Sequence, residues 1–230
     1  MTRPIRSLAV ADEPWPFWPA GNAIEEASLV ETWCKSVAFS PSWGTVEPAG
    51  PANGSSGRWL DEHVLEPLVC ARQDAWITDC LDTYRLSSGQ ASRIADTYVP
   101  NEAALGLPSA KISPHPGEAQ IVTEALATQR PRLLAELDEA MPEQVVTLGN
   151  AALRVFATLI DPSANPPPAF LTRSSYGEPM TVEVNGRSTS WLPLIHPGAR
   201  FGSDPQSWPG THQRWIADRA PDPEARTSEA

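Results

Sequence analysis

Apolar residues recur with the period of an α-helix in several parts of the chain. In the first part they occupy positions 24, 27, 29, 30, 33 and 34, one face of a helix that we expect from Ile24 to Lys35. A second helix opens at Gly57 and carries apolar residues at 59, 60, 64, 65 and 68. The same periodicity predicts helices over 118–139 with an interruption at Pro131, over 151–159, and over 208–220.

Short apolar runs bounded by turn-forming residues predict strands over 36–39, 74–80, 144–148, 182–184 and 188–195. Asn185-Gly186, between the last two runs, is the strongest two-residue hairpin signal in the chain. Strands near positions 37, 76, 146 and 194 are separated by helices. We therefore predict an α/β fold, a three-layer αβα sandwich around a central, mainly parallel four-stranded sheet.

Proline and glycine mark the boundaries of the expected domain. The chain holds 25 prolines and 14 glycines among 230 residues, so loops make up much of it. Residues 1–22 are rich in Pro and Trp, and we expect an ordered arm that packs its aromatic side chains on the domain. Residues 23–220 are expected to form one domain, and residues 221–230 a disordered tail.

Charge and cysteine content narrow the class of protein. The formal net charge of −11 argues against a protein that coats nucleic acid nonspecifically, but it is compatible with a DNA enzyme that has a local positive patch. With no long apolar stretch and no signal-peptide pattern, we expect a cytoplasmic protein without a membrane span. Cys34, Cys70 and Cys80 form no C-x-x-C pair and the four histidines are dispersed. We therefore expect reduced core thiols, no metal and no other cofactor.

Polar and turn-forming residues follow the predicted parallel strands. The segments concerned are Ser40–Glu47, Thr78-Asp79, Gly149-Asn150 and His196-Pro197. In open α/β sheets, ligands bind in the crevice beyond the carboxyl ends of the strands. We therefore predict that an active site forms where these four segments converge.

These segments resemble motifs of the uracil-DNA glycosylase superfamily. Pro142–Ala151 looks like that family's strand-to-helix element, a proline and a hydrophobic strand followed by Leu-Gly-x-x-Ala. Asn53–Asp61 is similar to its Gly-x-x-Gly-Arg-x-Leu-Asp stretch, and Leu194–Gly198 falls on its His-Pro-Ser motif. Ile77–Asp79 falls where the family has a strand ending in Thr-Asn. The resemblance covers roughly residues 36–219, with the motifs in the family's order.

The chain also departs from the family's pattern. The family's first motif reads Gly-(Asp/Glu/Gln)-x-Pro-Gly, but the corresponding stretch here is Ser40–Gly44, so the water-positioning side chain falls on Pro41. The stacking aromatic falls near Ala52, the serine of His-Pro-Ser is Gly198, and the base-reading asparagine is Asp79. Either the chemistry is distributed over other residues or the protein does not hydrolyse its ligand.

The resemblance implies a role for each matching position. His196 would donate a hydrogen bond to the departing base. The resemblance leaves water activation open because Pro41 cannot supply it, and the carboxylates that could supply it instead are Glu47 and Asp79. Residues implied to bind the base are Ser40, Ser42, Trp43, Gly44, Ala52, Asn53 and Thr78. Residues implied to contact DNA are Arg58, Gly198, Arg200 and Phe201.

Each of these roles has a structural alternative. His196 would otherwise be a buried histidine bonded to a carbonyl, Asp79 a helix or turn cap, and Glu47 a solvated loop charge. Ala52 would be misaligned by two or three residues if the loop differs in length. Arg58 would be an ordinary surface arginine.

Asp79 points to the class of base. A carboxylate accepts hydrogen bonds, which suits the exocyclic amine of cytosine better than the N3–H and O4 of uracil. Loss of the aromatic near Ala52 would enlarge the pocket for a bulky substituent. Together with the resemblance, which implies a DNA glycosylase, these two positions predict a monomeric enzyme that excises a hydroxymethylated or glucosylated cytosine from phage DNA in anti-phage defence. The alternatives are a uracil-type repair glycosylase and an inactive base-binding module on the same fold.

Overall fold

A computed structural model describes residues 23–36, 38–40, 54–82, 85, 88–93, 95–96, 99–100, 114–163, 173–199, 204 and 206–219 of the chain. The chain divides into two compact units. Unit 1 is made of Met1–Gly54 and Ile77–Gln120, and unit 2 of Ser55–Trp76 and Ile121–Ala230. The expected N-terminal arm and C-terminal tail lie outside the described residues.

Unit 1 contains helix α1 (Ala23–Ser36), where the apolar stripe predicts it, and the short helix α3 (Ser88–Arg93). The strand expected over 36–39 is not formed, because Ser36 is the last residue of α1 and the chain then turns. Ala38 has a φ of 50°. Its N–H donates to the Lys35 carbonyl at 3.2 Å, and the Phe39 N–H donates to the Cys34 carbonyl at 2.8 Å. Ala38 and Phe39 therefore close the C-terminal end of α1, with Ala38 in the left-handed conformation, and they are not extended as strand residues would be.

The strand expected over 74–80 is not formed either. Arg72–Asp74 is a single 3-10 turn, and the extended residues after it belong to no strand of the described sheet. Trp76 is 54% exposed, and Thr78 and Asp79 are also exposed. A central parallel strand is covered on both faces, so this exposure fits a surface segment.

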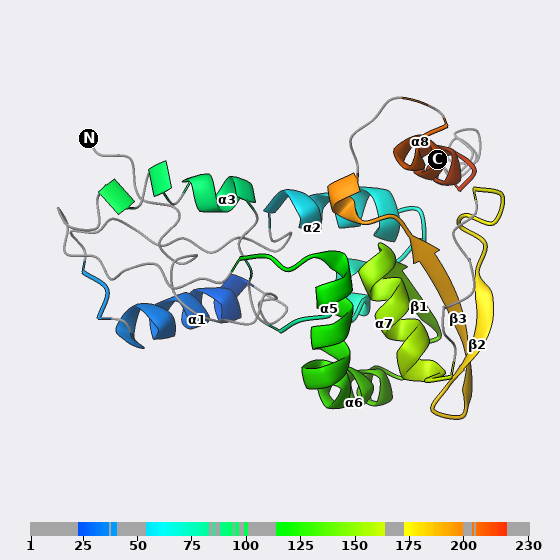
Figure 1. Ribbon diagram of the computed structural model, residues 1–230, viewed down its shortest axis with the longest axis horizontal. Coiled ribbons are helices and arrows are strands. Elements are labelled where there is room, and N and C mark those ends of the chain that lie inside the picture. The colour runs from blue at the N-terminus through cyan, green and yellow to red at the C-terminus, as the bar shows by residue number, and fades with distance from the viewer. Residues whose placement is uncertain are drawn as a thin grey trace, which may run out of the picture. The chain divides into compact units, whose positions relative to one another are not determined.

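The described residues of unit 2 form a mixed sheet of three strands in the order β1-β3-β2, where the sequence predicts four mainly parallel strands. Strand β1 (Gln144–Leu148) runs parallel to β3 (Arg187–Leu194), with Gln144 opposite Ser190 and Leu148 opposite Leu194. Strand β2 (Met180–Val184) is antiparallel to β3, and the predicted Asn185-Gly186 hairpin joins them (Figure 1). Both residues of this turn have positive φ, 49° and 75°, as a tight two-residue hairpin requires.

The helices of unit 2 follow the predicted periodicity closely. Their bounds are α2 Gly54–Leu60, α5 Glu118–Glu124, α6 Arg130–Ala140, α7 Asn150–Ile160 and α8 Trp208–Ala217. The first residues of α2 and α5 are the last residues of the two unit 1 segments in the sequence. Single helical turns add η3 (Asp61–Leu65) after α2 and η7 (Pro197–Ala199) after β3.

The interruption predicted at Pro131 lies one turn earlier than the proline itself. A widened turn, η6 (Ala125–Gln129), separates α5 from α6, and Pro131 takes one of the first two positions of α6. Proline has no N–H and its ring clashes with the carbonyl four residues before it. A widened turn at that carbonyl lets the chain remain helical, which explains the position of the break.

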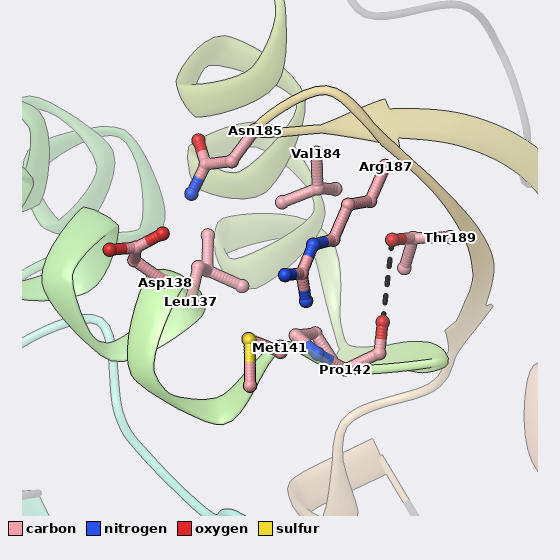
Figure 2. Close-up of a pocket in the computed structure, with 8 residues that line it drawn as sticks. All are labelled: Leu137, Asp138, Met141, Pro142, Val184, Asn185, Arg187 and Thr189. Atoms are coloured by element: carbon pink, nitrogen blue, oxygen red, sulfur yellow. Dashed lines mark hydrogen bonds between the residues drawn. The ribbon is translucent and has the colours of Figure 1, made fainter.

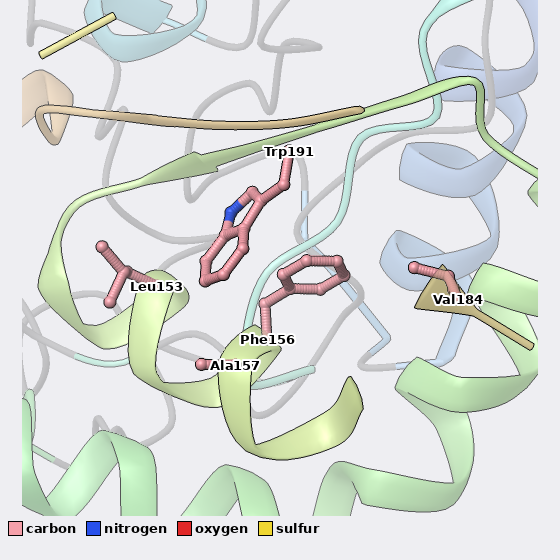
Figure 3. Packing of buried hydrophobic residues seen from close by; sticks show 5 residues of the cluster. All are labelled: Leu153, Phe156, Ala157, Val184 and Trp191. Atoms are coloured by element: carbon pink, nitrogen blue, oxygen red, sulfur yellow. The ribbon is translucent and has the colours of Figure 1, made fainter. Parts of the chain in front are cut away.

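The core of unit 2 lies between α7 and the sheet. Leu153, Phe156 and Ala157 of α7 pack with Val184 of β2 and Trp191 of β3, all of them buried (Figure 3). The rings of Phe156 and Trp191 meet edge to face with centroids 4.9 Å apart. The Trp191 indole N–H also donates to Thr147 Oγ1 of β1 at 3.0 Å, so its one polar atom is satisfied inside the core.

None of the three described cysteines is in a disulfide, and all three are only half-buried, where we expected core positions. Partial burial raises the pKa of the Cys34 thiol. No helix in the described part of the chain is both long and apolar enough to cross a membrane.

Candidate active site

The carboxyl ends of β1 and β3 bring two of the predicted motifs into contact. β1 ends at Leu148 opposite Leu194 of β3, and the Gly149 N–H donates to the Leu194 carbonyl at 2.8 Å. Gly149 has a φ of 87°, and a Cβ placed on it would lie 2.7 Å from Cβ of His196. Only glycine allows this approach, so it holds His196 directly against the start of α7.

Gly198 determines which nitrogen of His196 carries the proton. The Gly198 N–H donates to His196 Nδ1 at 2.9 Å, so Nδ1 is an acceptor and the proton of the neutral ring is on Nε2. A Cβ on Gly198 would lie 2.9 Å from Nδ1. The glycine found where the resembling family has serine thus leaves room for this ring. His196 is exposed, so it is not the buried histidine of the structural alternative.

Below His196, a buried network of hydrogen bonds holds the end of β3. The Ile195 N–H donates to Tyr176 Oη at 3.0 Å. Tyr176 Oη lies 2.7 Å from His212 Nδ1, and His212 Nε2 lies 3.0 Å from the His63 carbonyl oxygen. A carbonyl only accepts, so Nε2 of His212 is the donor and its Nδ1 accepts from the tyrosine hydroxyl. Every bond of the network therefore has a defined direction.

Aromatic rings enclose His212. It stacks on Trp59 with centroids 5.0 Å apart and on Trp215 with centroids 5.2 Å apart. The guanidinium of Arg219 lies over the Trp215 ring, with Cζ 4.7 Å from the ring centroid, and it donates to the Gly177 carbonyl at 3.1 Å. Only 1% of His212 is exposed, and this burial lowers its pKa to about 4. The ring is therefore neutral at physiological pH.

Burial acts on Tyr176 in the opposite direction. It raises the pKa of the phenol well above its usual value, against a smaller lowering effect of the Ile195 N–H. The hydroxyl therefore keeps its proton and can donate to His212.

The predicted site residues are divided between the two units and the undescribed parts of the chain. Ser40, Thr78 and Asp79 belong to unit 1, while His196, Gly198 and the exposed Arg58 belong to unit 2. The remaining predicted residues lie outside the described residues: Ser42, Trp43, Gly44, Glu47, Ala52, Asn53, Arg200 and Phe201. The contact that the structure establishes is the one between the Gly149 and His196 motifs.

Sequence reasoning missed Tyr176 and His212. A signal for His212 is present in the helix predicted over 208–220, where Trp208, His212 and Trp215 share the i, i+4, i+7 face. A histidine on such a face is buried and needs partners for both ring nitrogens. Tyr176 stands in a loop with no periodicity, and nothing in the sequence distinguishes it.

A small pocket lies at the opposite end of the sheet from His196. It is formed where the end of α6 meets the β2–β3 hairpin, and Figure 2 shows Arg187 directed into it beside Leu137 and Met141. Its volume of about 20 Å³ holds about one water molecule. This size excludes a base, so the pocket is not the expected site.

No family model matches this chain, and no curated protein sequence matches it either. Within the described ranges, no three His, Cys, Asp or Glu side chains lie close enough together to hold a metal ion.

Proposed function

We propose that this chain is a DNA glycosylase in which His196 donates a hydrogen bond to the base that leaves. The observation that carries the proposal is the bond from the Gly198 N–H to His196 Nδ1, which assigns the ring proton to Nε2 at an exposed strand end. A neutral ring with this proton position is a donor before the reaction begins. The contact of the Gly149 and His196 motifs, which the resemblance treats as parts of one site, gives further support.

The chemistry needs such a donor. The bond between the base nitrogen and C1′ of the sugar breaks, its electron pair leaves with the base, and water adds to C1′. Negative charge collects on N1 and O2 of the departing cytosine while the sugar becomes cationic. A hydrogen bond from a preorganised donor to the base oxygen is therefore stronger in the transition state than in the ground state. Such a bond lowers the activation free energy by about 3 kcal/mol.

The proposed substrate is a flipped-out cytosine with a hydroxymethyl or glucosylated hydroxymethyl group, in duplex DNA of an invading phage. In this proposal Asp79 accepts from the exocyclic amine, and Glu47 or Asp79 activates water. The residues that bind the base in this proposal are Ser40, Ser42, Trp43, Gly44, Ala52, Asn53 and Thr78. Those that contact the DNA are Arg58, Gly198, Arg200 and Phe201. The protein acts as a monomer in the cytoplasm without a cofactor.

The first test is His196→Ala. We expect the rate of abasic-site formation on duplexes that carry modified cytosine to fall about 10²-fold, as on removal of one preorganised donor. The fold should persist because His196 is exposed. His115→Ala, which removes another exposed histidine, is the matched control and should keep the wild-type rate. An unchanged rate in folded His196→Ala would remove this residue from the mechanism.

The second test, Asp79→Asn, concerns the base. An amide presents a donor as well as an acceptor, so the variant should excise modified cytosine about 5- to 150-fold more slowly and discriminate less against uracil. Rates are measured on duplexes carrying uracil, cytosine, hydroxymethylcytosine or its glucosylated form. Asp74→Asn, at an exposed aspartate a few positions earlier in the sequence, is the control. Wild-type excision of uracil alone would return the chain to the uracil-type alternative.

The second candidate function is base binding without hydrolysis. Pro41, at the position of the water-positioning side chain in the resembling family, favours it. Stable binding of a modified duplex by the wild-type protein, with no abasic sites formed, is the result expected of such a module. The same assays therefore decide between the two functions.

A further inference from the structure

The end of β3 is held by a side chain in place of a neighbouring strand. The ladder between β1 and β3 stops at the pair Leu148 and Leu194. The next residue, Ile195, is 7% exposed, and its N–H donates to Tyr176 Oη at 3.0 Å. A buried backbone N–H requires a partner, so the tyrosine hydroxyl determines where this peptide lies.

The orientation of the Tyr176 hydroxyl is fixed by His212. Its hydroxyl donates to His212 Nδ1, and His212 is held by its bond to the His63 carbonyl and by the rings of Trp59 and Trp215. The hydroxyl proton is thereby committed to His212, and an oxygen lone pair is directed at the Ile195 N–H. Each partner restricts the next, so the network behaves as one rigid support.

His196 is joined directly to this support. Its backbone follows Ile195, its Cβ lies against Gly149, and its Nδ1 accepts from the Gly198 N–H. A shift of the Ile195 peptide would carry the His196 backbone with it. It would also change the 2.9 Å bond that assigns the ring proton to Nε2.

We propose that Tyr176 is a positioning residue for His196, acting through the Ile195 N–H to hold the ring where Gly198 keeps its proton on Nε2. This inference rests on the proposed function, in which His196 is the donor. Tyr176 itself does not touch the base. Small misplacements of a catalytic group lower rates strongly, so loss of the tyrosine hydroxyl should act mainly on kcat.

The test is Tyr176→Phe in the full-length chain, with two measurements. In protein labelled with ¹⁵N-histidine, the ring signals of His196, identified by their absence in His196→Ala, report the share of each tautomer. We expect two widely separated nitrogen signals in the wild type and converging signals in Tyr176→Phe. On modified duplexes, kcat should fall about 10-fold or more while KM changes by less than about twofold.

Thr189→Val is the matched control. Thr189 is a buried residue of the same strand, and its hydroxyl donates to the Pro142 carbonyl at 3.3 Å, at the end of the sheet remote from His196. Thr189→Val removes a side-chain hydrogen bond at a buried residue of β3 but leaves both hydrogen bonds of Tyr176 in place. For Thr189→Val we expect the His196 ring signals and kcat of the wild type. This result would show that the effect of Tyr176→Phe comes from the position of His196 and not from a general loss of stability.

A second variant serves if Tyr176→Phe does not fold. His212→Gln keeps a donor for the His63 carbonyl but removes the acceptor that orients the tyrosine hydroxyl, and it should shift the His196 signals in the same direction. Unchanged His196 ring signals in the folded variants would overturn the inference whatever the activity. A wild type inactive on every duplex would overturn the proposed function, while the ring signals would still decide whether Tyr176 positions His196.

Discussion

Replacing Gly177 with alanine is expected to lower the free energy of unfolding by about 2–5 kcal/mol, the sum of a backbone and a packing contribution. Gly177 has a φ of 77°, and a Cβ on it would lie 1.9 Å from Cδ1 and 2.5 Å from Nε1 of Trp215. Trp215 is 4% exposed and packs against both His212 and the Arg219 guanidinium. The indole therefore has no room to move away, and the overlap must be relieved by displacing the network around Tyr176.

Gly186→Ala is a matched control for this substitution. Gly186 has a nearly identical φ of 75°, but nothing lies within 4 Å of a Cβ placed there. It should cost only the strain of a left-handed alanine, about 1 kcal/mol. Urea denaturation of the three proteins measures both values, and equal losses for the two variants would contradict the packing argument.

Acid is expected to destabilise the fold through His212, by about 3 kcal/mol between pH 6.5 and pH 4. Burial lowers the pKa of this ring from 6.5 to about 4 in the folded protein. Between these values the unfolded chain binds a proton that the folded chain does not, so stability falls as the pH falls. The contribution is complete above pH 6.5 and is lost by pH 4. Protonation would also remove the Nδ1 lone pair that accepts from Tyr176.

His212→Gln removes the titration while keeping a donor for the His63 carbonyl. Carboxylates contribute equally to both proteins, so the difference in unfolding free energy between wild type and variant isolates His212. We expect this difference to shrink by about 3 kcal/mol from pH 7 to pH 4 in urea denaturation. His115→Gln, at an exposed histidine, should follow the wild-type curve. Parallel curves for wild type and His212→Gln would show that His212 does not titrate in this range.

Alkali is expected to destabilise the fold through Tyr176, the hydrogen-bond partner of His212. Burial raises the pKa of Tyr176 above its ordinary value of 10.0. The unfolded chain then loses a proton that the folded chain retains, so this contribution is present below pH 10 and is lost as the pH rises further. The buried network is therefore most stabilising between the ordinary pKa values of histidine and tyrosine.

The elements that the sequence predicts well are those built from local interactions. The apolar stripe from Ile24 to Lys35 becomes α1, and the run Gln144–Leu148 becomes β1 with the same bounds. Asn185-Gly186 forms the expected hairpin because its two residues tolerate positive φ. In each case the deciding contacts lie within one turn of helix or between adjacent strands.

The two strand predictions that fail depend on distant partners. The run over 36–39 is apolar enough for a strand, but Ala38 and Phe39 close α1 by donating hydrogen bonds to the carbonyls of Lys35 and Cys34. The run around Trp76 stays extended without joining the described sheet. A short apolar run does not reveal whether another strand is present to pair with it.

For the candidate site, the sequence by itself determined that Gly149 and His196 follow two strands, because strand ends are marked by local turn residues. The tertiary structure decided that these strands are parallel neighbours, and therefore that His196 packs on Gly149. It also decided the tautomer of His196 and the burial of His212 beneath it, since both depend on hydrogen bonds to groups that folding brings close. The periodicity of apolar residues indicates which face of a helix or strand is buried. Which residues pack against that face is decided only when the chain folds.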